Sequence, residues 1–228
     1  MTLWHTVIVV LINLLWGSMF IAAAIGLREF PPIFFTGIRF GLLAVLLFYF
    51  LRVPQRLIGP LFKIGLVMGV GMYLTLYLSI SLAENTASIA VFSKLEVPFA
   101  LLLGVILLSE RMGAAQITGV CIAMAGAVII TFDPAAFSDL PALFWMAVSC
   151  GFSAYGFIQI RRLEKVHPFS IVAWISVVSA PALLGTSMIF ESNHLEVIQA
   201  STWSGWLALC YTAIMGSVIA NSGLYFLL

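Results

Sequence analysis

Eight apolar stretches of roughly 20 residues run through this chain, and their number and length restrict the folds open to it. A helix needs roughly 20 apolar residues to cross the hydrocarbon core of a bilayer. The period-two alternation of a membrane β-barrel is absent, so the stretches favour helices. The sequence therefore predicts an all-α integral membrane protein, a multi-helix bundle. The predicted spans are residues 5–27, 33–51, 61–83, 86–108, 114–132, 142–161, 169–190 and 203–226.

Charged side chains are scarce. Only 8% of the 228 residues are Asp, Glu, Lys or Arg, against about 25% in a soluble domain. Too few charges are present to coat a soluble globule, which excludes a water-soluble enzyme and a disordered tail. A net charge of +1 with no basic block excludes a nucleic-acid-binding surface. The expected partners are the lipid bilayer and a small-molecule substrate, with no nucleic acid.

No cofactor, metal site or catalytic residue is predicted. Cys121, Cys150 and Cys210 lie inside predicted spans at no metal-like spacing. The chain has no G-x-x-x-x-G-K-[ST] motif to bind ATP, and no H-E-x-x-H or G-x-S-x-G motif. Any transport must therefore be driven by an ion or substrate gradient.

The distribution of Lys and Arg predicts the orientation of the bundle. Seven of them lie in or beside the loops 52–63, 109–113 and 161–168, whereas the alternate loops hold only Arg28. Short loops rich in Lys and Arg stay in the cytoplasm. We expect a cytoplasmic N-terminus in a bacterial inner or plasma membrane. The consistent bias also supports the number of spans, because one missed span would invert every later loop.

A weak internal repeat relates the first span to the sixth. Residues 16–34 match residues 152–170 at a constant offset that places Pro168 on Pro32 without a gap. In the predicted topology the two segments cross the membrane in opposite directions. Two halves of opposite topology form an inverted repeat, which is a common transporter architecture.

Several short motifs match a known family pattern. Trp16-Gly17-Ser18-Met19-Phe20 resembles a W-G-x-x-F motif in a first helix, and Pro31-Pro32 with Arg39-Phe40 resembles the P-x…R-F opening of a second. Pro98 followed by Glu110-Arg111 resembles the P…E-R pattern that ends a fourth helix. On these motifs the chain resembles the EamA-type members of the drug/metabolite transporter superfamily, which include amino-acid and metabolite exporters. The resemblance implies a bundle of inverted five-helix EamA repeats.

The two halves differ in length. Residues 5–132 match a complete first repeat of five helices, and residues 142–228 match a partial second repeat of three. Family members typically have ten helices, so the resemblance implies a truncation after the eighth. It also leaves open a second function, that of an incomplete, transport-inactive fragment or subunit of a ten-helix transporter.

Three charged residues lie inside predicted spans, where charge is costly and usually functional. Lys94 and Glu96 lie roughly 12–15 Å into their span. Residues two apart do not face each other on a helix, so each charge needs a partner elsewhere. The pair either lines a cavity, where it binds a zwitterionic substrate or relays a proton, or forms structural salt bridges. Arg39 either holds a substrate carboxylate or extends to the interface.

Proline and aromatic residues extend this candidate site. Pro98 and Pro181 predict helix kinks, which commonly line cavities because lipid cannot satisfy the freed backbone group. Tyr73 and Tyr77 share a helix face, and Asn221 and Tyr225 repeat their spacing in the eighth span. Each polar group has the alternative of a simple helix-to-helix hydrogen bond. The predicted substrate-binding or proton-coupling residues are Lys94, Glu96, Arg39, Trp16, Tyr73, Tyr77, Tyr155 and Asn221.

Two G-x-x-x-G pairs, Gly37/Gly41 and Gly65/Gly69, predict close helix approach. Packing inside the bundle is the favoured use, and a homodimer contact is the alternative.

The predicted function is a secondary transporter that exports a small polar metabolite such as an amino acid, with proton antiport as the natural coupling at Glu96. An intramembrane hydrolase using Ser93 and Lys94 is disfavoured, because neighbours on a helix point about 100° apart.

Overall fold

The computed structural model describes residues 3–109, 112–131, 140–163 and 166–227. All regular structure in these ranges is helical, which confirms the predicted all-α fold. The elements are α1 (Leu3–Gly26), α2 (Pro32–Leu46), η1 (Phe48–Leu51), α3 (Gln55–Ile64), η2 (Gly65–Met72), α4 (Tyr73–Leu82), α5 (Thr86–Phe92), η3 (Ser93–Leu95), α6 (Glu96–Leu108), α7 (Ala114–Thr131), α9 (Leu140–Arg161), α10 (Pro168–Phe190), α11 (His194–Ala200), α12 (Trp203–Tyr211), η4 (Thr212–Asn221) and α13 (Ser222–Leu227).

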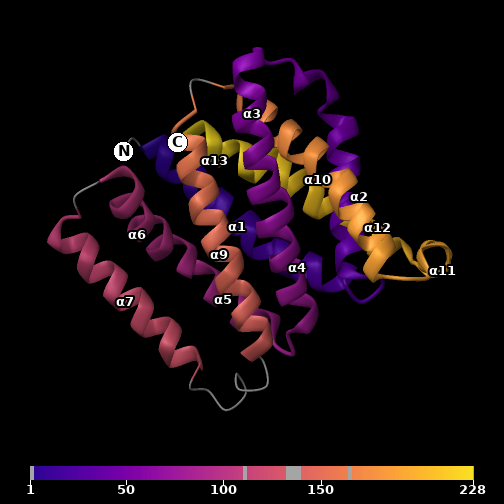
Figure 1. Cartoon of the computed structure of the whole chain (residues 1–228). Coiled ribbons are helices and arrows are strands. Elements are labelled where there is room, and N and C mark those ends of the chain that lie inside the picture. Colours follow the sequence, from indigo (N-terminus) through magenta and orange to yellow (C-terminus); the bar gives the residue numbers. More distant parts are fainter. Residues whose placement is uncertain (1–2, 110–111, 132–139, 164–165, 228) are drawn as a thin grey trace.

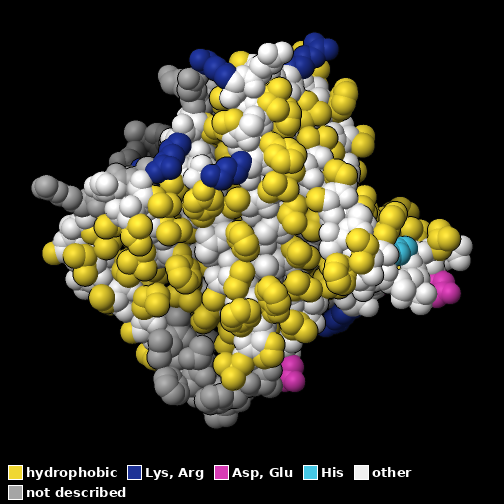
Figure 2. Space-filling model, in the orientation of Figure 1, with side chains coloured by type: hydrophobic (Ala, Val, Ile, Leu, Met, Phe, Trp, Pro, Cys, Tyr) yellow, Lys and Arg dark blue, Asp and Glu magenta, His cyan; other side chains and the backbone are white. Residues whose placement is uncertain are grey.

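Within the described ranges, six helical segments are long and apolar enough to cross a membrane, and two shorter apolar helices occupy the other predicted spans. The shorter α2 has 15 residues and is continued by the 3₁₀-helix η1 up to Leu51. Hydrophobic side chains are spread over the whole visible face, with few charged side chains among them (Figure 2), as a lipid-facing surface requires. The chain is therefore a multi-pass membrane protein. The six long segments are Val7–Gly26, Gln55–Leu82, Thr86–Leu107, Leu140–Arg161, Pro168–Phe190 and Trp203–Phe226.

The core of the bundle forms where α10 packs on α2 and η2, and where α9 packs on α4 and α6 (Figure 1). The helices α2 and α10 begin at Pro32 and Pro168, the positions that the sequence repeat superposes. In contrast, α7 lies at the edge of the bundle beside α6, and nearly all its described side chains are exposed. The centre of the protein is thus built mainly by α1, α2, α4, α9, α10 and η4.

Glycines of both G-x-x-x-G pairs pack inside the bundle, against α10. A Cβ on Gly65 would lie 2.8 Å from Val178 Cβ, and one on Gly37 would lie 2.8 Å from Leu184 Cδ2. A Cβ on Gly69 would overlap Ser179 Oγ. These contacts explain the glycines within a single chain, because any larger side chain would push two helices apart.

Two π-helical segments, η2 and η4, interrupt the third and eighth predicted spans. Long π segments are rare and are frequently found at functional sites. Side chains of neighbouring helices donate hydrogen bonds to carbonyl groups in both segments. In η2, Gly65 O accepts from Ser179 Oγ at 3.2 Å and Met72 O accepts from Ser149 Oγ at 2.9 Å. In η4, Thr212 O accepts from Arg39 at 3.1 Å. These segments are not predictable from the sequence pattern, since a π-helix has no apolar periodicity distinct from that of a buried α-helix.

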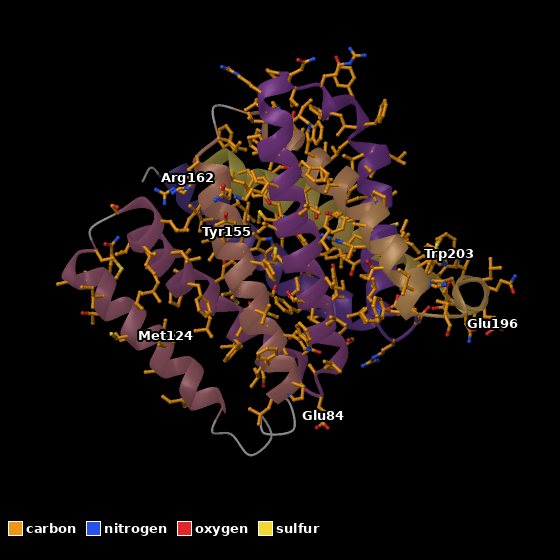
Figure 3. The ribbon with its side chains drawn as sticks, viewed as in Figure 1. Glu84, Met124, Tyr155, Arg162, Glu196 and Trp203 are labelled. Carbon is orange, nitrogen blue, oxygen red and sulfur yellow. The ribbon has the colours of Figure 1, made fainter. Side chains whose placement is uncertain are left out.

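The charged residues separate toward different parts of the molecule. Lys and Arg side chains gather at the upper part of the molecule in Figure 2, and Figure 3 shows Arg162 there, with Glu84 at the bottom and Glu196 at the far right. Two glutamates, Glu191 and Glu29, accept hydrogen bonds from the start of α2 and from the start of α12, respectively. Glu191 accepts from the amides of Ile33 and Phe34 at 2.9 and 2.8 Å. Each glutamate thus satisfies backbone or hydroxyl donors at the start of a helix in the other half.

The second of these glutamates, Glu29, accepts from Thr202 N at 2.6 Å, Thr202 Oγ1 at 2.7 Å and Ser204 Oγ at 2.9 Å. These hydrogen bonds, led by that of the Thr202 side chain, lower the pKa of Glu29. A carboxyl whose pKa is lowered by folding stabilises the fold above its unfolded pKa, and this contribution is lost as pH falls through the folded pKa.

We therefore expect the melting temperature of the detergent-solubilised protein to fall on acidification between about pH 5 and pH 3, and to fall less steeply in Glu29→Gln. Thermal unfolding followed by fluorescence measures both. The matched control is Glu196→Gln, which removes an exposed carboxylate on α11 and should leave the acid dependence unchanged. Equal slopes for the wild type and Glu29→Gln would contradict the assignment.

Candidate transport cavity

A cavity of about 220 Å³ lies inside the bundle, with walls from α1, η2, α4, η3, α6, α9, η4 and α13. This volume is below the roughly 300–1,000 Å³ of typical small-molecule sites. Six of the eight predicted site residues line it: Trp16, Tyr73, Tyr77, Lys94, Glu96 and Asn221.

Lys94 enters the cavity from η3, where one 3₁₀ turn separates α5 from α6. Its Nζ donates to Asn13 Oδ1 at 3.2 Å and lies 5.9 Å from the Trp16 ring centroid. The Asn13 amide is held in turn, since its Nδ2 donates to Val9 O at 2.9 Å. The hydrogen bond and the ring contact of the ammonium are both to neutral groups, and its charge interacts electrostatically with the Glu96 carboxylate.

Glu96 is the first residue of α6 and lines the same cavity, half-buried. The lining also includes Ser153 and Cys150 of α9. Ser153 Oγ is buried and, within the described part of the chain, has no hydrogen-bond partner. Cys150 Sγ lies 3.4 Å from Ser93 O. The cavity therefore contains a carboxylate, an ammonium and a buried hydroxyl among mostly apolar walls.

A hydrogen-bonded relay crosses the wall from α1 to α4. Trp16 Nε1 donates to Asn221 Oδ1 at 3.1 Å, and Asn221 Nδ2 donates to Tyr73 Oη at 2.7 Å. Asn221 is the last residue of η4 and Tyr73 is the first residue after η2. The two π-helical segments therefore meet at this relay, which the predicted Tyr and Asn faces of the third and eighth spans did not specify.

Arg39 lies outside the cavity, and neither predicted role describes its position. Its side chain is fully buried and does not reach an interface. One guanidinium nitrogen donates to Thr212 O and Ser217 Oγ. Arg39 Cζ lies 4.5 Å from the ring centroid of Tyr73 and 5.7 Å from that of Tyr77. The guanidinium thus contacts two tyrosines that line the cavity, and is held by η4.

Tyr155 does not line the cavity. It is half-buried on α9, about two turns before Arg162 (Figure 3), and Lys63 Nζ lies 5.4 Å from its ring centroid. Residue type and spacing do not separate Tyr155 from Ser153, because the difference lies in the rotation of α9 about its axis.

The two prolines differ from the predicted kinks in detail. The irregular turn in the fourth span is η3, which precedes Pro98, and Pro98 itself lies in the first turn of α6. A proline in a first turn removes an N–H that has no helical partner. Pro181 lies inside α10, which runs from Pro168 to Phe190 without a break.

Apolar residues form most of the remaining wall, and the sequence analysis did not select them. Three methionines, Met19, Met68 and Met72, line the cavity, and Tyr225 Oη lies 3.9 Å from the sulfur of Met68. Methionine is flexible and adapts to irregular contacts. No sequence signal distinguishes such residues from others in an apolar helix.

Comparisons with known proteins agree with the fold. A solved structure described as "Crystal structure of protein" is similar over 99% of this chain and 79% of its own, with a TM-score of 0.71 and 20% identity. The chain is 23% identical to the "Probable amino-acid metabolite efflux pump" of Salmonella typhimurium, over 92% of this chain and 73% of the relative. It is 25% identical to the "Uncharacterized inner membrane transporter YedA" of Escherichia coli K12, over 94% and 71%.

The family comparison covers more than half of the chain. Residues 3–132 match the EamA-like transporter family, in the region that carries the tryptophan, proline and arginine motifs. The names of these relatives and the multi-pass helical fold agree that the protein is a membrane transporter of the drug/metabolite type. On this match, the chain belongs to the EamA-like transporter family.

Proposed function

We propose that this protein is a gradient-driven exporter of a small zwitterionic metabolite such as an amino acid. The observation that carries the proposal is that Lys94 and Glu96, of opposite charge, both line one mostly apolar cavity inside the bundle. The N-terminus lies in the cytoplasm, as the excess of Lys and Arg in alternate loops supports.

Physical cost favours a zwitterion over a neutral solute. Charges within a membrane span are expensive unless they are paired or hydrated. A zwitterion brings a carboxylate for Lys94 and an ammonium for Glu96, while an apolar side chain meets Met68, Met72 and Phe157. The name of the Salmonella typhimurium relative, a probable amino-acid metabolite efflux pump, supports the same substrate class.

Glu96 also supplies a site for coupling. A proton bound to its carboxylate removes the charge that holds the substrate ammonium, so proton and substrate compete for one group. Such competition produces antiport when each species crosses alone, which supports export driven by an inward proton gradient.

Counterflow in proteoliposomes tests the proposal. Vesicles are loaded with the twenty standard amino acids and given the same mixture outside with radiolabel. We expect uptake of at least one amino acid above protein-free vesicles, and acceleration of export by an inward proton gradient. An absence of flux for all twenty would overturn the proposed substrate class and favour the transport-inactive alternative.

The native Cys150 provides an independent measure of occupancy. In the double variant Cys121→Ala/Cys210→Ala, Cys150 is the remaining thiol and it lines the cavity. We expect the amino-acid mixture to slow its modification by a methanethiosulfonate reagent at least about threefold, because an occupant excludes the reagent. The matched control keeps only the exposed Cys121, whose rate should not change. Equal rates at Cys150 with and without the mixture would contradict occupancy of this cavity.

A further inference from the structure

The donors and acceptors of the relay fix which way each hydrogen bond points. An indole N–H only donates, so the oxygen of the Asn221 amide must face Trp16, at 3.1 Å. The amide nitrogen then faces Tyr73 and donates to its hydroxyl oxygen at 2.7 Å. Tyr73 Oη is therefore an acceptor within the wall, and its own hydrogen has no acceptor among the described residues.

The free hydrogen of Tyr73 belongs to a residue that lines the cavity. Trp16 lies between the relay and the ammonium of Lys94. The indole N–H of Trp16 donates to Asn221 in the relay, and the Trp16 ring centroid lies 5.9 Å from Lys94 Nζ. One donor hydroxyl and one cation thus line the same cavity. A carboxylate is a group that accepts a charge-assisted hydrogen bond from a hydroxyl or from an ammonium.

Arg39 stands behind this wall. Its guanidinium lies over the Tyr73 ring at 4.5 Å and close to Phe40 at 5.1 Å. Phe40 packs edge-on against Tyr73, with ring centroids 5.1 Å apart. Two nitrogens of the Arg39 guanidinium, Nε and one Nη, are buried without a hydrogen-bond partner among the described residues. A cation over an aromatic ring draws electron density from it, so the hydroxyl on that ring becomes a better donor.

We propose that Tyr73 donates its hydroxyl hydrogen to a carboxylate oxygen of the cavity occupant, and that Arg39 is a positioning residue for Tyr73 that never touches the occupant. The inference rests on the proposed function for the identity of the occupant, and it adds which residues recognise the carboxylate. It also gives a use to a fully buried guanidinium that lies outside the cavity.

The test uses two probes of the same shape, acetate and acetamide, each labelled with ¹³C and titrated by NMR line broadening against the full chain in detergent. We expect the wild type to prefer acetate. Tyr73→Phe keeps the ring beneath Arg39 and removes only the hydroxyl, and should reduce the preference about tenfold, the equivalent of one charge-assisted hydrogen bond. An unchanged preference in Tyr73→Phe, or none in the wild type, would overturn the proposal.

A double-mutant cycle tests the positioning role of Arg39. Arg39→Met keeps much of the buried volume and should lower the preference for acetate in the wild-type background about threefold or more. In the Tyr73→Phe background the same change should have no effect, since Arg39 acts through the missing hydroxyl. Arg39→Lys retains a cation and should recover part of the preference. A purely structural role predicts equal losses in both backgrounds, and that result would overturn the role.

The outcomes separate this inference from the proposed function. Counterflow that is normal in Tyr73→Phe and Arg39→Met would overturn the subsite and leave the exporter standing. A Tyr73-dependent preference for acetate without any amino-acid flux would retain the carboxylate subsite and overturn the exporter.

Discussion

Amino-acid counterflow is expected to fall about 10- to 100-fold in Glu96→Gln and in Lys94→Met, at unchanged expression. Each change removes one charged side chain that lines the cavity and that we propose as a partner of the substrate, and a hydrogen bond to a charged group contributes about 1.5–3 kcal/mol. Because both charges act on one occupant, the double variant should be little worse than either single variant. Initial rates in proteoliposomes, measured at equal protein content, give these values.

Two variants outside the cavity are the controls for this measurement. Lys63→Met removes an ammonium that lies 5.4 Å from the Tyr155 ring centroid, and Glu196→Gln removes an exposed carboxylate on α11. Both should transport at the wild-type rate. Normal flux in both Glu96→Gln and Lys94→Met would remove these residues from the site, and a loss in the controls would point to a general effect of charge.

The largest effect on stability is expected for Gly69→Val. A side chain at Gly69 would overlap Ser179 Oγ and lie 3.1 Å from Ile175 Cγ2, both on α10. Separation of η2 from α10 would also break the hydrogen bond from Ser179 to Gly65 O. Overpacking costs about 1–3 kcal/mol, and a lost buried hydrogen bond adds about 1 kcal/mol. We expect a melting temperature several degrees lower, or failure to insert.

Gly41→Val is the matched control, because it makes the same change in the other G-x-x-x-G pair. A Cβ at Gly41 meets nothing within 4 Å, so its melting temperature should stay near that of the wild type. Thermal unfolding in detergent, followed by size-exclusion chromatography, compares the two. Similar losses at both positions would show that the close approach of η2 and α10 is not the cause.

Much of the fold was accessible from the sequence. Apolar length placed six spans and two shorter helices, because burial in lipid depends on the hydropathy of each segment by itself. The short motifs of residues 3–132 indicated the family that the comparison then showed. Whether the second half forms an inverted partial repeat, and which end faces the cytoplasm, stay predictions.

The candidate site was accessible only in part. Charge inside a span identified Lys94 and Glu96, since lipid makes an idle charge too costly. The same argument selected Arg39, which is buried behind the cavity wall. Tyr155 was selected as a polar aromatic side chain inside a predicted span, and it lies outside the cavity. The free-energy cost of burying a charged side chain in lipid indicates that the residue has a role, but it does not indicate which neighbouring side chain the residue contacts.

By itself, the sequence determined that this protein is embedded in a membrane. It also determined which segments form the membrane helices and which charged side chains are too costly to bury in lipid without a role. Each of these follows from the transfer of one segment or one side chain into lipid. Only the tertiary structure decided that Trp16, Asn221 and Tyr73 form a relay, that Arg39 lies over Tyr73, and that Gly69 faces Ser179. Those contacts depend on how far each helix is rotated about its axis against its neighbours, and hydropathy that is nearly uniform around a membrane helix leaves that rotation undefined.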